Sequence, residues 1–350
     1  MQDRPPTATI LDVALAAGVS TATVSRVLAG IGNPRPATAA AVLEAVQQLG
    51  YRPSGVARSL RLRRTRTIGL IVTDIQNPFF PELVQAADTA ARSLGYSILL
   101  GSAAHDEHRA MYYLDLMADR RVDGMLIATS QLSEESWRWL LGSPVPVVVV
   151  NAEPSDPRVA VVTSDNHGGA RLAAEHLISL GHRRIAWVRG PGTFTADVPR
   201  LEGFRAACRA AGLPPDATPE LQGDGQVEGG ERAGRALVEL RPDVTAVACY
   251  NDLTAIGVLR ALRATGRHVP DDISVIGCDD IAAASWVVPR LTTVAQEKAK
   301  MGRIAVERLI ARLDDPNAPE PDTVRLPMTL RIRESTAPIG LRAGHNVEPA

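Results

Sequence analysis

Several side chains that can hydrogen-bond a small polar molecule stand directly after short apolar runs. The segment Asp74–Phe80 follows one such run, Tyr250–Asp252 follows a second, and Asp279–Asp280 follows a third. Arg200 opens a helix-like segment, and its guanidinium can clamp adjacent hydroxyls or a carboxylate. Asn and Asp side chains supply both donors and acceptors for hydroxyl groups. These residue types indicate a binding site for a polar small molecule.

The elements that must position these residues alternate along the chain. Helix-length segments at Glu82–Leu94, Arg171–Leu180, Leu253–Ala264 and Lys298–Leu313 lie between short β-branched runs. We expect strands at Ile68–Thr73, Ser97–Leu100, Gly124–Ala128, Val145–Val150, Val159–Thr163, Ile185–Val188, Val244–Ala248 and Ser274–Gly277. Hydrophobic strands alternating with helices predict parallel sheets covered on both faces. Two such lobes leave a crevice at the carboxyl ends of their strands, where the polar residues would meet a ligand.

The N-terminal part reads as three short helices. Thr9-x-x-Asp12 fits a capping box, Gly18 can make a sharp turn, and Ser20 can cap a second helix from Thr21 to about Ala29. A third amphipathic helix is expected from about Ala37 to Leu49. This arrangement is typical of a helix-turn-helix, although the pattern alone leaves open an ordinary helical cap with a charged face.

The second of these helices has the composition of one that enters a major groove. Val24, Val27 and Leu28 recur at helical spacing and are expected to face inward. The outward residues are small or polar apart from one arginine, Arg26, which could bond a guanine bidentately.

The segment Thr9–Leu28 resembles the DNA-binding motif of the lactose-repressor (LacI/GalR) family, and Gly50–Leu60 resembles its hinge. The similarity continues to about Pro338. The resemblance implies that Thr21 and Ala22 occupy positions whose residue type varies among family members with the operator sequence. It also implies that Arg26 contacts a base. It also implies phosphate contacts, which position the domain without reading sequence, for Thr9, Ser20, Thr23, Ser25, Asn33, Thr38 and Tyr51. Residues 33–41 depart from the family pattern, which carries more charge there.

By the same resemblance, residues 54–61 form a hinge helix that folds only on DNA, against the same segment of a second chain. Two turns of helix are too short to be stable alone in water. Leu60 is the matching minor-groove wedge, and small Ala57 would let the paired helices approach closely. The alternative for Leu60 is a linker leucine packed on the body.

The implied fold is α plus α/β. An N-terminal three-helix helix-turn-helix domain with a hinge helix precedes two doubly wound parallel-sheet lobes of periplasmic-binding-protein type. We expect the DNA-binding domain at 1–53, the hinge and linker at 54–66, the effector-binding domain at 67–338 and a flexible tail at 339–350. The N-lobe would comprise about 67–163 plus 298–327, and the C-lobe about 167–295 plus 329–338. The chain would then cross between lobes near 163–167, 295–298 and 327–329.

In the effector-binding domain, the resemblance points first to Phe79, Phe80, Arg200, Asn251 and Asp279, then to Asn77, Thr163 and Gln296. Polar clamps with aromatics favour a sugar or sugar derivative, and a nucleobase or nucleoside is the alternative. Some neighbouring residues favour structural roles. Asp252 and Asp280 favour helix caps, and core positions are expected for Phe204, Trp137, Trp139 and Trp187, while Trp286 stays open.

Charge is distributed unevenly along the 350 residues. Residues 1–66 hold nine arginines against Asp3, Asp12 and Glu44, so their net charge is +6 and that of the rest is −7. Only the N-terminal part is therefore expected to meet a polyanion. The partner would be a pseudo-palindromic double-stranded operator, which requires a homodimer because inverted half-sites need symmetric readers. The helix at Lys298–Leu313 would contribute to the dimer interface by resemblance.

No 18-residue apolar run and no secretory signal are present, so we expect a cytoplasmic protein that does not enter a membrane. Cys208, Cys249 and Cys278 are too far apart for a disulfide framework or a zinc site and favour buried thiols. His105 and His108 could mimic a metal pair, but they are expected on a polar loop without a third ligand. We therefore expect no metal and no cofactor.

The sequence disfavours two other classes of protein. An enzyme is disfavoured because GxSxG, P-loop and strand-linked GxGxxG motifs are lacking, and Gly223–Gly230 is only a glycine-rich loop of low specificity. A transport binding protein would need an export signal and would not need residues 1–60. The sequence therefore predicts a transcription regulator, a repressor by resemblance, whose operator affinity is controlled by a small molecule bound between the lobes.

Overall fold

The structure is a computed structural model that describes residues 8–28, 30–51, 64–129, 132–154, 156–192, 194–315 and 323–340. The chain divides into two compact units, Met1–Arg66 and Thr67–Ala350, and each is described by itself. The expected hinge helix, with Ala57 and Leu60, and the expected tail from 341 onward lie outside the described residues.

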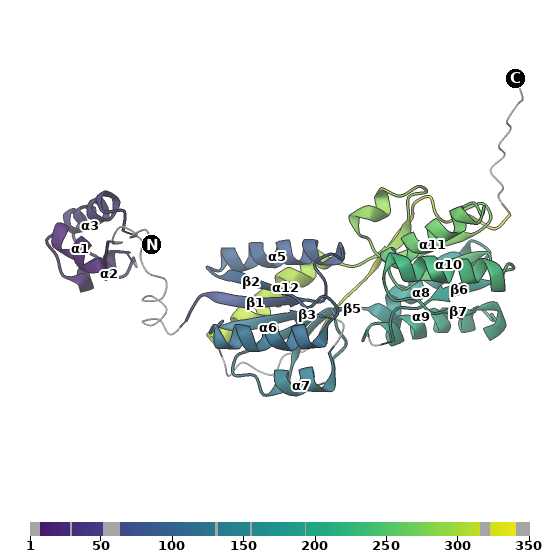
Figure 1. The fold of residues 1–350 in the computed structure, drawn as a ribbon, viewed down its shortest axis with the longest axis horizontal. Coiled ribbons are helices and arrows are strands. Elements are labelled where there is room, and N and C mark those ends of the chain that lie inside the picture. Colours follow the sequence, from purple (N-terminus) through teal and green to yellow (C-terminus); the bar gives the residue numbers. More distant parts are fainter. Residues whose placement is uncertain are drawn as a thin grey trace, which may run out of the picture. The chain divides into compact units, whose positions relative to one another are not determined.

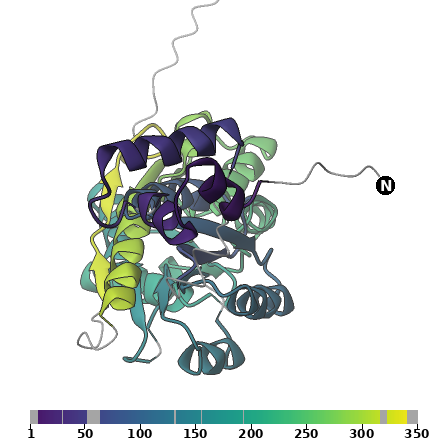
Figure 2. The same ribbon diagram turned by 90° about the vertical axis from the view of Figure 1, so that its left-hand side faces the viewer.

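The N-terminal unit contains α1 (Ile10–Ala16), α2 (Thr21–Leu28) and α3 (Pro36–Gln48), and all three helices contact one another (Figure 2). The predicted capping box is present at Thr9 and Asp12, and the Thr23 amide donates to Ser20 Oγ at 3.1 Å. Gly18 has a φ of 63°, which makes the turn between α1 and α2. Val13, Val24 and Val42 are fully buried, so one apolar side chain from each helix forms the centre of this small core.

The larger unit holds two six-stranded sheets, one in each lobe (Figure 1). The N-lobe sheet has the order β11-β5-β4-β3-β1-β2, and the C-lobe sheet has the order β12-β10-β9-β8-β6-β7. The N-lobe strands are β1 (Thr67–Val72), β2 (Ser97–Ser102), β3 (Gly124–Ala128), β4 (Val147–Val150), β5 (Ala160–Ser164) and β11 (Val324–Leu326). The C-lobe strands are β6 (Ile185–Val188), β7 (Glu220–Leu221), β8 (Ala246–Cys249), β9 (Ser274–Asp279), β10 (Thr292–Ala295) and β12 (Thr329–Arg331). All pairings are parallel except that of β10 with β12.

The expected strands all form, with bounds within two residues of the prediction. The strands β7, β10, β11 and β12 were not predicted. Strands β7, β11 and β12 have two or three residues, which is too short for a hydrophobic pattern to stand out from a loop. Strand β10 is as long as the predicted β6 and was simply missed. Strand β11 pairs with β5, more than 150 residues earlier, so only the assembled sheet defines it.

Helices cover both faces of the N-lobe sheet (Figure 1). On one face, Leu70 and Val72 of β1 pack with α5 (Phe79–Ser93) and α12 (Lys298–Asp314). On the other, Ile71 packs with α6 (Glu107–Asp119) and α7 (Glu134–Leu141). Helices α5 and α12 lie so close that a Cβ added at Gly302 would stand 2.4 Å from the Leu83 carbonyl oxygen. Helices on both faces agree with the doubly wound prediction, which rested on hydrophobic strands alternating with helices along the chain.

The C-lobe repeats the design. Helices α8 (Asn166–Ser179) and α9 (Asp197–Ala210) cover one face, and α10 (Val227–Leu240) and α11 (Asp252–Ala264) cover the other. Trp187 and Phe204 are buried with ring centroids 5.1 Å apart, as expected for core residues. Trp137 is also buried and Trp139 is partly buried, while Trp286 is 76% exposed. All three cysteines are free and buried.

The chain passes between the two sheets three times. It leaves the N-lobe sheet after β5, returns after β10 to form α12 and β11, and leaves again to form β12. Each crossing lies at the same end of the sheets, between the two lobes, because it follows the carboxyl end of a strand.

Several local predictions were wrong. Helix α5 begins at Phe79 rather than Glu82, because Pro81 is tolerated in a first helical turn. Helix α8 begins at Asn166 rather than at Arg171. Its start was predicted too late because glycine has a low helix propensity, and two glycines stand in its first turn. The segment Gly223–Gly230 is a loop only to Gln226, and α10 begins at Val227. His108 lies on α6 rather than on a loop.

Among the described residues, no single helix is long and apolar enough to cross a membrane, and only the bent pair α1 and α2 passes that test jointly.

Candidate functional site

A small cavity of about 30 Å³ lies between the two lobes of the larger unit. The N-lobe supplies side chains from the ends of β1, β2 and β4 and from the start of α5, and the C-lobe supplies side chains from α9 and from the ends of β8 and β9. The lining residues are Thr73, Asn77, Phe79, Phe80, His105, Asn151, Arg200, Tyr250, Asn251, Asp279 and Gln296. This space holds little more than one water, whereas small-molecule sites commonly measure about 300–1,000 Å³. A ligand of monosaccharide size therefore needs more space than this arrangement of side chains and lobes provides.

The structure brings together seven of the eight residues predicted for this site. Thr163 does not line the cavity and is fully buried in β5. Its neighbour Ser164 instead donates to Gln296 Oε1 at 2.6 Å, because successive side chains of a strand point to opposite faces.

Sequence reasoning missed Thr73, His105, Asn151 and Tyr250 as lining residues. Asn151 and Tyr250 each follow directly on a strand, and Asp279 is the last residue of one, so all three stand at the carboxyl ends of strands. His105 was considered only as a metal ligand. Among the described residues, no cluster of three or more His, Cys, Asp or Glu side chains could hold a metal.

Arg200 is the central cation of the cavity and is only 4% exposed. Its Nε donates to Asn166 Oδ1 at 2.9 Å, its Nη1 donates to the Tyr250 carbonyl at 2.5 Å, and its Nη2 lies 3.6 Å from Asp279 Oδ1. The guanidinium also lies 4.7 Å from the centre of the Tyr250 ring. Burial lowers the pKa of Arg200, but electrostatic interaction with Cys278, Tyr250 and Asp279 outweighs it, so the pKa is raised overall. The guanidinium is therefore a fixed positive charge.

Asp279 is the matching anion. It is the last residue of β9, and it is 5% exposed. Burial raises the pKa of its carboxyl group, and the nearby Arg200 charge and the Gln296 hydrogen bond oppose that shift. Gln296 Nε2 donates to Asp279 Oδ1 at 2.6 Å. The residue has a φ of 120°, so the backbone turns sharply where the side chain enters the cavity.

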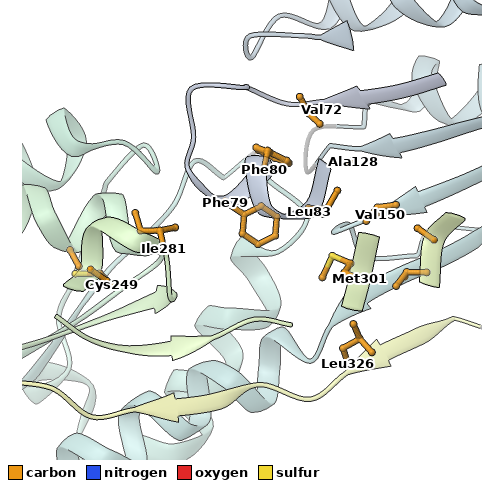
Figure 3. Packing of buried hydrophobic residues seen from close by; sticks show 14 of the residues in the cluster. Val72, Phe79, Phe80, Leu83, Ala128, Val150, Cys249, Ile281, Met301 and Leu326 are labelled. Carbon is orange, nitrogen blue, oxygen red and sulfur yellow. The ribbon is translucent and has the colours of Figure 1, made fainter. Parts of the chain in front are cut away.

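Aromatic rings form the apolar part of the site. Phe79 and Phe80 are both buried, with ring centroids 5.2 Å apart and planes at 84°, and Figure 3 shows them beside Leu83 on the N-lobe core. Across the crevice, Phe194 stacks on His105 with centroids 5.9 Å apart. His105 Nε2 also lies 3.3 Å from Gln226 Nε2 and 3.5 Å from Asp74 Oδ2. The aromatic rings therefore come from both lobes.

Two asparagines of the cavity use their side chains to shape the backbone. Asn77 Oδ1 accepts from the Phe79 amide at 3.0 Å, which helps begin α5. Asn251 caps α11 by accepting from the Thr254 amide, and its Nδ2 donates to the Gly225 carbonyl. Both residues therefore orient the loops that carry the other lining side chains.

The helix-cap predictions for Asp252 and Asp280 were wrong. Asp252 is the first residue of α11, behind the cap Asn251, and it accepts from the Thr293 hydroxyl and the Ile281 amide. Asp280 pairs with Arg333 at 2.5 Å. Both carboxylates tie the end of β9 to neighbouring segments, which a local sequence pattern cannot reveal.

The N-terminal unit presents a separate surface. A groove brings together Ser20, Thr23, Arg26, Asn33 and Thr38, five of the residues predicted to contact DNA. Thr21, Ala22 and Arg26 are exposed along α2, Thr9 is exposed before α1, and Ser25 and Tyr51 are half-buried. Arg35 also lines the groove and was not predicted. The groove therefore carries hydroxyls, one amide and two guanidinium groups, which can hydrogen-bond DNA phosphates and the edges of bases.

Comparison with known proteins identifies both units. A model described as "Bacterial regulatory proteins, lacI family" matches residues 9–54, and a "Periplasmic binding protein-like domain" matches residues 174–336. The ribose operon repressor of Escherichia coli (strain K12) is 40% identical over 312 residues, which cover 88% of this chain and 94% of that protein.

The chain belongs to the LacI family.

Other members of the LacI family agree with this assignment. The HTH-type transcriptional repressor PurR of Aliivibrio salmonicida is 35% identical over 309 residues, covering 88% of this chain and 93% of that protein. Among solved structures, the Lac repressor dimer bound to operator and an anti-inducer has a TM-score of 0.86 at 27% identity, covering 95% of this chain and all of that chain. A complex of the transcriptional regulator CelR with cellobiose has a TM-score of 0.73 at 35% identity, with the same coverage.

Membership of the LacI family confirms the expected fold, a helix-turn-helix followed by two α/β lobes of periplasmic-binding-protein type. The chain is a DNA-binding, ligand-regulated transcription regulator and not an enzyme. The site agrees with that function, because it brings charged, polar and aromatic side chains of both lobes together around one cavity.

Proposed function

We propose that this LacI-family regulator is a homodimeric cytoplasmic repressor that binds a pseudo-palindromic operator and responds to a sugar or sugar derivative. Residues 1–53 would form the DNA-binding domain, 54–66 the hinge, 67–338 the effector-binding domain and 339–350 the tail. Within the hinge, Leu60 would enter the minor groove and Ala57 would let the paired helices approach.

The observation that carries the choice of effector is the buried pairing of Arg200 with Asp279 beside aromatic rings. A charged donor and a charged acceptor on one wall suit adjacent hydroxyls, which both donate and accept hydrogen bonds. Phe79 and Tyr250 also line the cavity, and their rings would contact the carbon side of a sugar ring. The ribose operon repressor is a relative at 40% identity, and a LacI-family regulator from Enterococcus faecium with bound ribose is a structural neighbour at 33% identity and a TM-score of 0.71.

Control of DNA binding would follow from the two-lobe design. The cavity as it stands is smaller than a sugar, so we expect ligand binding to change the arrangement of the lobes. A ligand shifts operator affinity only if it binds the two lobe arrangements with different affinity. We expect a coupling of about 1–3 kcal/mol, or roughly 5–150-fold in operator affinity.

The test combines two measurements on the full chain. Thermal unfolding with D-ribose, cellobiose and adenosine identifies the class of ligand, since a hundredfold excess over Kd stabilises the folded state by about 2.7 kcal/mol. Operator binding with and without the active compound then gives the direction of control. A thermal shift with adenosine and none with a wider panel of sugars would overturn the sugar assignment in favour of a nucleoside.

A further inference from the structure

A continuous row of polar contacts leads from the ligand cavity to the surface of the N-lobe. Arg200 Nε donates to Asn166 Oδ1 at 2.9 Å, and Asn166 Nδ2 donates to Glu153 Oε1 at 3.0 Å. The other carboxylate oxygen of Glu153, Oε2, accepts from Arg325 Nη1 at 2.7 Å. Asn166 is 1% exposed, while the Arg325 side chain is 47% exposed. The row therefore begins in the buried cavity and ends in solvent.

This row crosses from one lobe to the other at Glu153. Arg200 on α9 and Asn166 on α8 belong to the C-lobe, whereas Glu153 stands between β4 and β5 and Arg325 on β11, both in the N-lobe. The Glu153 amide makes a second contact between the lobes, because it donates to Thr195 Oγ1 at 3.2 Å. Glu153 thus holds the C-lobe through its side chain and through its backbone.

The chemistry of the row gives it a direction. Arg200 can only donate and the Glu153 carboxylate can only accept, so the residue between them must accept from one and donate to the other. The Asn166 amide does both with a single rigid group. Any movement of the Arg200 guanidinium that turns this amide must therefore also disturb its bond to Glu153.

We propose that Asn166 and Glu153 are positioning residues, which communicate the position of the Arg200 guanidinium to the N-lobe. This inference rests on the proposed function, in which Arg200 contacts the effector. When the guanidinium is held as in this structure, the amide bridges the lobes and the Glu153–Thr195 contact is closed. When a ligand draws the guanidinium away, the bridge weakens and the N-lobe is released.

Amide hydrogen exchange at Glu153 tests this without any ligand. The Asn166→Asp variant keeps an acceptor for Arg200 but places a carboxylate against Glu153, so exchange of the Glu153 amide should rise by roughly tenfold. Adding Glu153→Gln to that variant reverses the hydrogen bond, because the new amide donates to Asp, and should restore slow exchange. The Arg200→Lys variant removes the Nε donor and should raise exchange at Glu153, although the two residues do not share a contact.

Asp156→Asn is the matched control. Asp156 stands on the same loop as Glu153, but its carboxylate pairs with Arg158 within that loop at 2.7 Å. Its neutralisation should leave exchange at Glu153 unchanged. Urea unfolding of each variant shows that the comparison is made between folded proteins. The proposal is overturned if Arg200→Lys leaves exchange of the Glu153 amide unchanged. It is also overturned if adding Glu153→Gln to Asn166→Asp does not restore slow exchange of the amide at position 153. The experiment uses no sugar, so its result does not depend on whether the effector is a sugar.

Discussion

Replacing Asp279 with asparagine separates the role of its charge from the role of its shape. Asparagine is isosteric, keeps an acceptor for Gln296 Nε2 and tolerates the φ of 120° found at this position. Alanine would instead leave the Gln296 amide without its acceptor, and the buried Arg200 without its nearby anion, a change that costs about 3–5 kcal/mol of stability. Asparagine also removes the anion beside Arg200, so some loss of stability is expected, smaller than for alanine because Gln296 keeps its acceptor, and urea unfolding shows that the variant is folded in the assay.

The expected loss of sugar affinity follows from the type of hydrogen bond that is changed. A bond to a charged acceptor contributes about 1.5–3 kcal/mol and a bond between neutral groups about 0.5–1.5 kcal/mol. The difference of about 1–1.5 kcal/mol for each ligand hydroxyl corresponds to a roughly 5- to 12-fold weaker Kd. A sugar that places two hydroxyls on Asp279 would lose about a hundredfold.

Isothermal calorimetry with D-ribose, or with the sugar that gives the largest thermal shift, measures this Kd. Asp280→Asn is the matched control, because the adjacent carboxylate pairs with Arg333 and does not line the cavity. Operator binding without sugar should be unchanged in both variants, since the DNA-binding surface lies in a unit with its own core. A Kd for Asp279→Asn within twofold of the wild type would refute the assignment of Asp279 to the ligand site.

Three further predictions concern other parts of the chain. Arg26→Ala should abolish specific operator binding while the sugar Kd stays unchanged, and wild-type affinity in a gel-shift titration would remove Arg26 from the recognition surface. Burial lowers the pKa of His182 from its ordinary 6.5, so the unfolded chain binds the proton more readily. Stability should therefore fall as the pH drops below about 6.5, and urea titrations of His182→Gln should show a weaker dependence on pH. Gly302→Ala should destabilise the protein by about 1–3 kcal/mol, because the new Cβ would stand 2.4 Å from the Leu83 carbonyl oxygen, and an unchanged urea midpoint would contradict the packing of α5 on α12.

Local signals in the sequence predicted most of the elements and most of the cavity. Strands such as Gly124–Ala128 were predicted to the residue, because continuous apolar runs of that length suit a sheet covered on both faces. Asp279 and Asn251 stand close to the ends of two strands, and the family resemblance assigned both to the ligand site. Asn151 follows a strand in the same way and was overlooked, while Tyr250 was noticed beside Asn251 but not assigned to the site.

Other features could not be predicted, because they depend on partners far away in the chain. Strand β11 is three residues long and is defined by its pairing with β5, more than 150 residues earlier. Thr163 and Ser164 have similar side chains, and only the assembled sheet shows that Ser164 faces Gln296. Asp252 reads as a helix cap until the fold brings Thr293 and Ile281 to its carboxylate.

By itself, the sequence determined the short N-terminal helices and the alternation of strands and helices, because caps, turns and hydrophobic periodicity act over a few residues. The resemblance to the LacI/GalR family added the helix-turn-helix assignment and most of the residues predicted for the crevice. Only the tertiary structure decided how the charged groups are paired and how Asn166 and Glu153 join the lobes. Hydrogen bonds between distant segments depend on distances of a few tenths of an ångström, and the packing of both lobes sets those distances.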